Sequence, residues 1–296
     1  MQAHPFQVDG QTRAFAVLGH PVSHTLSPVM HNAALRALHM NALYMAFDVH
    51  PDHLMTALRG MARMGFGGVN LTIPHKEIAY RHVDQHAESA LLTGSVNTIA
   101  FEQDGTLTGH STDGYGLRQA LSEAFARTFT DADVLVLGCG GAGRAAALEA
   151  ALHGAARVRL ANRTPARISA LLPELRAAAP NTDFLPCAAW PPSPEDTQPA
   201  TLMLNATAVG MNADDTPPLT PAHLHPGQAR LDMTYVLPET PLMRIANAAG
   251  AQAANGLGML LHQGARSFEI WTGTPPPLNP MRNALRQAMY GDTEHV

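Results

Sequence analysis

A glycine-rich segment in the middle of the chain constrains the fold more than any other feature. Residues 138–143 read Gly-Cys-Gly-Gly-Ala-Gly, after the apolar run 134–137 and at the start of an alanine-rich stretch, 142–153. This is the pattern G-x-G-x-x-G between a buried strand and a helix, where glycines permit a tight turn and close approach of the backbone to a pyrophosphate. A dinucleotide-binding unit is therefore expected. The predicted contacts of the loop are Gly138, Gly140, Gly141, Ala142 and Gly143.

The end of the next predicted strand, 157–161, indicates which dinucleotide is bound. NAD sites commonly place Asp or Glu there, about 20 residues beyond the loop, to hold the ribose hydroxyls. Here the chain has Asn162, Arg163 and Thr164, with Arg167 one helical turn later. Two guanidinium groups can pair with a 2′-phosphate and no carboxylate repels it, so NADP is favoured over NAD. The alternative is that the arginines only solvate the start of a helix.

Apolar strand-like runs alternate with helical patterns along the chain, as in 15–18 followed by 28–38 and 43–49 followed by 51–64. This alternation predicts an α/β fold with a mostly parallel sheet. A length of 296 residues indicates two domains. We expect an N-terminal α/β substrate domain and a Rossmann-type NADP-binding domain, with C-terminal helices returning to the first. The predicted ranges are 1–112 with 257–296 for the substrate domain and 113–256 for the NADP domain.

Composition narrows the partners to small molecules. The net charge of −5 argues against a nucleic-acid binder, and no apolar run reaches the roughly 18 residues of a membrane span. Cys139 and Cys187 alone do not make a disulfide framework, and residues 1–11 contain no basic, apolar leader, so a cytoplasmic location is expected. The sequence leaves both a monomer and a homodimer open.

One lysine stands out among the basic residues. Of 19 lysines and arginines, 18 are arginine and the exception is Lys76. Lysine can lose its proton in a protein, whereas arginine does not. Lys76 follows the predicted strand 68–73, at the edge where α/β sheets bind ligands, and Asp113 stands at the start of a predicted helix. Together they could transfer the proton that accompanies hydride delivery to a ketone, although each alone could be part of a surface ion pair.

Histidines suggest two further hypotheses. His20 and His24 are four residues apart, but Pro21 between them favours a turn, and no cysteine or carboxylate completes a ligand set, so no metal site is predicted. His75 could donate a proton because its ordinary pKa lies near neutrality. Because His75 is adjacent to Lys76, we expect it to be a neighbour of the proton donor and not the donor itself.

Several segments resemble the motifs of one family. Residues 19–28 resemble G-x-P-x-x-H-S-x-S-P, residues 70–76 resemble N-x-T-x-P-x-K, and residues 94–98 resemble G-A-V-N-T. The resemblance continues in order through most of the chain, at 138–145, 162–164, 205–211, 232–242 and 256–273. On these motifs the chain resembles the shikimate dehydrogenases of the shikimate/quinate dehydrogenase family.

The resemblance implies a reversible, NADPH-dependent reduction of 3-dehydroshikimate to shikimate, a reaction of aromatic amino acid biosynthesis. It implies that Lys76 and Asp113 are the catalytic acid/base pair. The implied substrate contacts are Thr25, Ser27, Thr72, Asn97, Tyr235 and Gln263. The implied cofactor contacts beyond those above are Thr207, Gly256 and Met259. For Tyr235 and Met259 ordinary core packing is the alternative.

Departures from the motifs leave the substrate open. Thr25 replaces the first serine of the family motif and adds a methyl group beside the expected position of the substrate carboxylate. Quinate carries an extra hydroxyl on the carbon that bears its carboxylate, so a quinate/shikimate dehydrogenase paralogue is one alternative. Ser111 replaces an asparagine before Asp113. A non-catalytic NADP-binding regulator on the same fold is the other alternative.

Overall fold

The structure is a computed structural model that describes residues 8–291. Residues 1–7 and 292–296 lie outside the described residues. The prediction that residues 1–11 contain no leader therefore falls largely outside them. The chain forms two compact units: unit 1 is Met1–Tyr115 with Leu261–Val296, and unit 2 is Gly116–Leu260. The predicted domain boundaries, after residues 112 and 256, lie a few residues before the boundaries between these two units.

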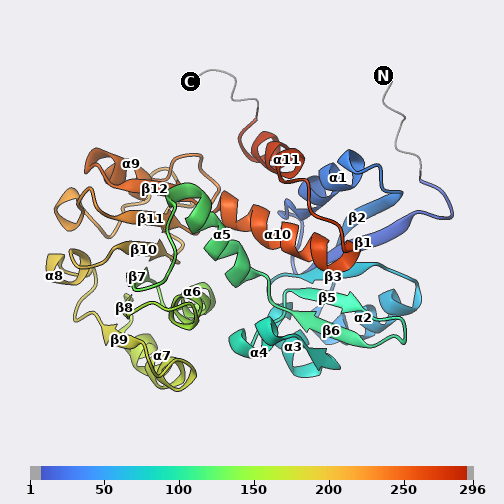
Figure 1. The fold of residues 1–296 in the computed structure, drawn as a ribbon, viewed down its shortest axis with the longest axis horizontal. Coiled ribbons are helices and arrows are strands. Elements are labelled where there is room, and N and C mark those ends of the chain that lie inside the picture. Colours follow the sequence, from blue (N-terminus) through green and yellow to red (C-terminus); the bar gives the residue numbers. More distant parts are fainter. Residues whose placement is uncertain (1–7, 292–296) are drawn as a thin grey trace. The chain divides into compact units, whose positions relative to one another are not determined.

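Unit 1 is built on a six-stranded mixed sheet with the order β2-β1-β3-β5-β6-β4 (Figure 1). Its strands are β1 (Arg13–Gly19), β2 (Ala42–Asp48), β3 (Gly68–Leu71), β4 (Gln85–His86), β5 (Thr98–Phe101) and β6 (Leu107–His110). β1 runs parallel to β2 and β3, whereas β5 runs antiparallel to β3 and β6. A turn at Asp104-Gly105 joins β5 to β6, with Gly105 at φ 87°.

The helices of unit 1 come from both ends of the chain. They are α1 (Ser27–Ala37), η1 (Pro51–His53), α2 (Leu54–Arg63), α3 (His75–His82), α4 (Glu88–Thr93), the larger part of α10 (Leu257–Thr272), and α11 (Leu278–Tyr290). α2 buries Leu54, Leu58 and Met61, the spacing of one helix face, against the core under β1 and β3. At the end of α10, Trp271 donates from Nε1 to the carbonyl of Ile99 at 2.9 Å. The C-terminal helices are thereby part of the first unit, as predicted.

Unit 2 contains a fully parallel six-stranded sheet with the order β12-β11-β10-β7-β8-β9. Its strands are β7 (Asp133–Leu137), β8 (Arg157–Ala161), β9 (Asp183–Pro186), β10 (Leu202–Asn205), β11 (Ala229–Asp232) and β12 (Gln252–Asn255). Its helices are the larger part of α5 (Asp113–Phe125), α6 (Gly141–Leu152), α7 (Pro165–Ala178), α8 (Pro194–Thr197), η2 (Pro221–His223) and α9 (Pro241–Ala248). Numbered within the unit, this is the Rossmann order 3-2-1-4-5-6.

The strands of this sheet are apolar on both faces. Along β7, Val134 and Val136 belong to one core cluster, and Leu135 and Leu137 belong to the other. Such strands are typical of parallel sheets that helices cover on both sides. The proline-rich segment 190–199 contains α8, which is stabilised by a capping box and by the buried Thr197. Within residues 8–291, no helix combines the length and the apolar character that crossing a membrane requires.

Candidate active site

Lys76 and Asp113 are in contact within unit 1, and each lies at the start of a helix. β3 ends at Leu71, and a turn in which His75 N donates to the carbonyl of Thr72 at 2.8 Å leads into α3. Lys76 is the second residue of α3, and Asp113 is the first of α5. The Nζ of Lys76 lies 2.6 Å from Oδ2 of Asp113, and the two side chains are 30% and 24% exposed. The pair is thus partly shielded but open to a ligand.

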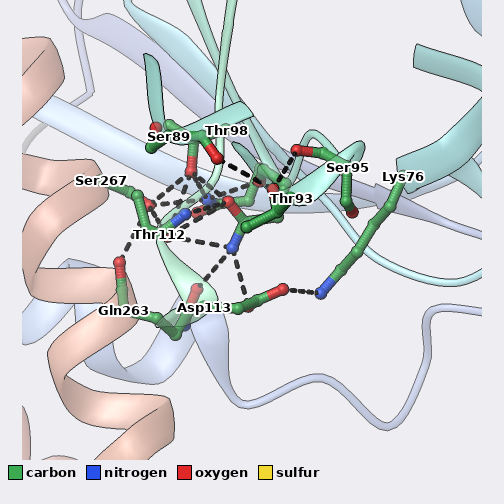
Figure 2. A network of polar contacts seen from close by, with 11 residues as sticks. Lys76, Ser89, Thr93, Ser95, Thr98, Thr112, Asp113, Gln263 and Ser267 are labelled. Atoms are coloured by element: carbon green, nitrogen blue, oxygen red, sulfur yellow. Dashed lines mark hydrogen bonds and ion pairs between the residues drawn. The ribbon is translucent and has the colours of Figure 1, made fainter. Parts of the chain in front are cut away.

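Asn97 holds the other oxygen of the aspartate. The backbone N–H of Thr112 donates to Oδ1 of Asn97 at 2.8 Å, and because a backbone N–H can only donate, this contact fixes the orientation of the amide. Nδ2 therefore faces Oδ1 of Asp113 at 2.9 Å and Oε1 of Gln263 at 3.3 Å (Figure 2). Both carboxylate oxygens of Asp113 accept hydrogen bonds, which is the arrangement of an ionised acid.

The predicted hydroxyl contacts come from both units, Thr25, Ser27 and Thr72 from unit 1 and Tyr235 from unit 2. Oγ1 of Thr25 donates to Oγ of Ser27 at 3.2 Å, at the start of α1. Thr72 packs so closely on the end of β1 that a Cβ at Gly19 would lie 2.5 Å from its methyl carbon, which only glycine avoids. Tyr235 follows β11 in unit 2, where burial raises the pKa of its phenol, so it is a neutral donor.

The glycine loop between β7 and α6 has the backbone that its sequence requires. Gly138 has φ 95°, in the left-handed region, and a Cβ at Gly143 would collide with the carbonyl oxygen of Gly138. Gly140 and Gly141 are exposed with open space where a Cβ would stand, and Ala142 is exposed in the first turn of α6. Unpaired N–H groups at a helix N-terminus favour an anion, so these residues fit a pyrophosphate.

Asn162 connects this loop to the turn after β8. Its Oδ1 accepts from the N–H of Cys139 at 2.9 Å, and its Nδ2 donates to the carbonyl of Thr164 at 2.9 Å. Arg163 and Thr164 are exposed on this turn, and Arg167 is exposed in the first turn of α7. Burial raises the pKa of the Cys139 thiol to about 11, and the positive charge of Arg167 opposes that rise. The donor set fits the 2′-phosphate of NADP.

The remaining predicted cofactor residues are also in unit 2. Oγ1 of Thr207 donates to Oδ1 of Asn205 at 2.7 Å, and Nδ2 of Asn205 donates to Oδ1 of Asp232 at 2.6 Å. A Cβ at Gly256 would collide with the carbonyl of Met233. Met259 is half-buried and packs against the core of unit 2, so the core-packing alternative keeps some support.

No role was predicted from the sequence for the buried polar residues around Asn97. Asn70, Thr98, Thr112 and Ser267 are each at most 5% exposed and are hydrogen-bonded to one another or to Asn97. The available signal was a polar side chain inside an otherwise apolar strand or on an apolar helix face, because a buried polar group requires partners.

Two alternatives from the sequence find no support in the geometry. Burial lowers the pKa of His75, which is fully buried, so it is poorly suited to donate a proton to a ligand. Among the residues described, no three His, Cys, Asp or Glu side chains are grouped to hold a metal ion.

The fold and the sites together define a class of protein. A Rossmann-ordered parallel sheet with a dinucleotide loop, joined in one chain to an α/β unit that carries a lysine–aspartate pair, is the arrangement of a two-domain nicotinamide-dependent dehydrogenase.

Comparisons with known proteins identify the family. Residues 17–99 match the shikimate dehydrogenase substrate binding domain, and residues 256–286 match the shikimate 5′-dehydrogenase C-terminal domain. Shikimate dehydrogenase (NADP(+)) of Citrifermentans bemidjiense is 42% identical over 283 residues, which cover 94% of this chain and 96% of the relative. The chain belongs to the shikimate dehydrogenase family.

Solved structures agree with this assignment. Shikimate 5-dehydrogenase of Thermus thermophilus, in complex with NADP(H) and shikimate, has a TM-score of 0.81 at 37% identity, over 94% of this chain and all (100%) of that one. Quinate dehydrogenase of Corynebacterium glutamicum, in complex with NAD, has a TM-score of 0.84 at 26% identity, over 92% and 98%. The same fold therefore serves related substrates.

Proposed function

We propose that the chain catalyses the reversible, NADPH-dependent reduction of 3-dehydroshikimate to shikimate. The observation that carries the proposal is the contact of 2.6 Å between Lys76 and Asp113, in a chain whose 42% identical relative is a shikimate dehydrogenase (NADP(+)). Unit 1 is the proposed substrate domain and unit 2 the proposed NADP domain. With both cysteines free, a reducing, cytoplasmic compartment is proposed.

NADPH, when bound, supplies the hydride that adds to C3 of the substrate. In the direction of reduction, Lys76 donates a proton from Nζ to the C3 carbonyl oxygen, which becomes the hydroxyl of shikimate. In the reverse direction the neutral amine of Lys76 takes that proton back. Asp113 holds the ammonium through Oδ2, while Asn97 keeps Oδ1 in place, so the donor is oriented before the substrate arrives. A positioned acid/base group of this kind accelerates a reaction by about 100-fold to 10,000-fold.

The other proposed contacts position the two ligands. The hydroxyls of Thr25, Ser27 and Tyr235 bind the substrate carboxylate, and Thr72, Asn97 and Gln263 bind its ring hydroxyls. The loop residues Gly138, Gly140, Gly141, Ala142 and Gly143 bind the pyrophosphate, and Asn162, Arg163, Thr164 and Arg167 bind the adenosine 2′-phosphate. Thr207, Gly256 and Met259 complete the cofactor site.

The test is a panel of substrates and cofactors on the unaltered chain and on Lys76→Ala. The expected result is NADPH oxidation with 3-dehydroshikimate and a fall in kcat of about 100-fold or more in the variant, because the proton donor is lost. Glu77→Ala, which removes an exposed side chain next to Lys76 on α3, is the control and should keep full activity. Near-normal turnover by Lys76→Ala would refute the mechanism, and no NADPH oxidation by the unaltered chain would favour a regulator.

A second candidate, oxidation of quinate, rests on Thr25. Its methyl group and its hydrogen bond to Ser27 alter the side that receives the carboxylate-bearing carbon, where quinate has its additional hydroxyl. Initial rates on shikimate and quinate with NADP+ and NAD+ separate the candidates. Faster turnover of quinate with NAD+ than of shikimate with NADP+ would replace the first proposal by the second.

A further inference from the structure

Tyr44 of β2 is a buried residue whose placement the core alone does not explain. It is 2% exposed, and Asn32 holds its backbone on both sides: Oδ1 accepts from Tyr44 N at 2.9 Å, and Nδ2 donates to Tyr44 O at 2.8 Å. The ring of His31 stacks on the phenol with centroids 4.3 Å apart and planes 7° from parallel. Backbone and ring are therefore both fixed by α1, which carries Asn32 and His31.

This support directs the hydroxyl of Tyr44 at the amide of Asn70, with the side chain of Ser27 as a second hydrogen-bonding partner. The hydroxyl donates to Oδ1 of Asn70 at 2.7 Å. Nδ2 of Asn70 faces the backbone carbonyl of Asn97 at 3.1 Å, and since a carbonyl can only accept, the amide cannot be turned around without losing this contact. In this orientation Oδ1 is the atom that accepts from Tyr44. Burial raises the pKa of Tyr44 well above its ordinary value, so the hydroxyl keeps the proton it donates.

Asn70 continues the contacts towards the proposed acid/base pair. Its Nδ2 also lies 3.1 Å from Oγ1 of Thr98 and 3.0 Å from Oγ of Ser267. Thr98 in turn donates to Oδ1 of Asn97 at 3.1 Å, and Asn97 donates to Asp113 (Figure 2). Thr98 and Ser267 are fully buried, so water cannot replace a hydrogen bond that is lost. The loss of one partner therefore changes the hydrogen bonds of the neighbouring side chains.

We propose that Tyr44 is a positioning residue for the acid/base pair. The hydroxyl of Tyr44 fixes the amide of Asn70. Asn70 holds Asn97 by donating to the backbone carbonyl of Asn97 and by its contact with Thr98. Asn97 in turn holds Asp113 opposite Lys76. This inference rests on the proposed function. Without the hydroxyl, Oδ1 of Asn70 has lost its donor, and the amide is released from the orientation on which the next contacts depend.

The alternative is that Tyr44 only fills the core, in which case phenylalanine serves equally well. Tyr44→Phe keeps the ring and its stacking on His31 and removes one oxygen. The experiment compares four proteins, namely the unaltered chain, Tyr44→Phe, Asn70→Ala and the double variant. Tyr80→Phe is the matched control, because the ring of Tyr80 packs on His86 outside this set of contacts.

The quantity measured is kcat and KM for NADPH-dependent reduction of 3-dehydroshikimate, below the unfolding temperature of every variant. We expect kcat to fall about tenfold in Tyr44→Phe, since a small misplacement of reacting groups is costly, with a change in KM under about twofold. In the Asn70→Ala background, Tyr44→Phe should have no further effect on kcat, because Tyr44 acts through Asn70. Tyr80→Phe should match the unaltered chain.

Two results would overturn the inference alone. One is a kcat of Tyr44→Phe equal to that of the unaltered, active chain. The other is an equal loss from Tyr44→Phe in both backgrounds, the behaviour of a residue whose effect on kcat does not pass through Asn70. No turnover by the unaltered chain would instead overturn the proposed function, and this inference with it.

Discussion

At the scale of single residues, the chain separates two uses of positive charge. Arg163 is exposed on the turn after β8 and Arg167 in the first turn of α7, and a permanently charged, planar group suits a phosphate. Lys76, the only lysine, lies 2.6 Å from Asp113 at a position proposed for proton transfer, which arginine could not perform. The choice of cation at each position thus follows the chemistry proposed for it.

The proposed phosphate contacts predict a cofactor-specific effect. Arg163→Ala and Arg167→Ala should each raise KM for NADPH about tenfold or more, because a charge-assisted hydrogen bond to a phosphate contributes about 1.5–3 kcal/mol. KM for NADH, which has no 2′-phosphate, should stay nearly constant. Steady-state kinetics with both cofactors measures this. Arg286→Ala, which removes an exposed arginine of α11 in unit 1, is the charge-matched control. Equal changes for both cofactors would contradict the assignment.

At the scale of elements, the proposed site residues gather just after strands. Thr72 follows β3, Asn162 follows β8, and Thr207 follows β10. Ligands of α/β sheets bind beyond the carboxyl ends of parallel strands, where the side chains and N–H groups of the following turns are available. In unit 2, β7 lies between β8 and β10, at the point where the strand order reverses, and the glycine loop follows β7.

Two glycines of the loop should respond differently to alanine. Gly143→Ala introduces a Cβ that collides with the carbonyl of Gly138, so we expect a loss of about 1–3 kcal/mol of stability. Gly140→Ala meets open space, so stability should stay within about 0.5 kcal/mol while NADPH binding weakens, because the methyl group occupies the approach of the pyrophosphate. Thermal unfolding with and without NADPH measures both effects. A destabilised Gly140→Ala with normal binding would contradict this reading of the loop.

At the scale of the whole molecule, distant segments build each unit. Asn70 and Ser267 are hydrogen-bonded although 197 residues separate them, because the end of α10 and all of α11 belong to unit 1. His31 is buried in the same unit, where its ring packs against those of Tyr44, Phe268 and Trp271. Burial lowers the pKa of His31 from its ordinary value of 6.5 to about 3. The unit therefore holds a neutral imidazole.

This histidine predicts a pH dependence of unfolding. Between pH 6.5 and about 3 the unfolded chain binds a proton at His31 that the folded chain does not, so stability is fully present above pH 6.5 and is lost as pH falls. The loss from this group is about 1.4 kcal/mol per pH unit. His31→Phe, which retains a ring beside Tyr44, should flatten the curve of unfolding free energy against pH below 6.5, as measured by urea denaturation. His53→Gln, at an exposed position, is the control. An unchanged slope in His31→Phe would contradict the prediction.

Elements that contain a clear apolar run were predicted, whereas three short strands without one were not. The predicted strand 157–161 is β8 with the same bounds, and the apolar run 134–137 lies in β7. β4, of two residues, and β9 and β12, of four residues each, were not predicted. Strands this short carry too little alternation to be recognised, and it is pairing with a neighbouring strand that stabilises them.

The sequence by itself determined the α/β class, the dinucleotide loop and the cofactor preference, because each depends on local geometry: glycine at Gly138 and Gly143, and arginine after β8. It also singled out Lys76 by composition. Only the tertiary structure decided that Lys76 meets Asp113, and that Tyr44, Asn70 and Ser267 lie behind them. Those contacts depend on which strands pair and where the C-terminal helices pack, and a side chain's periodicity does not record its distant partner.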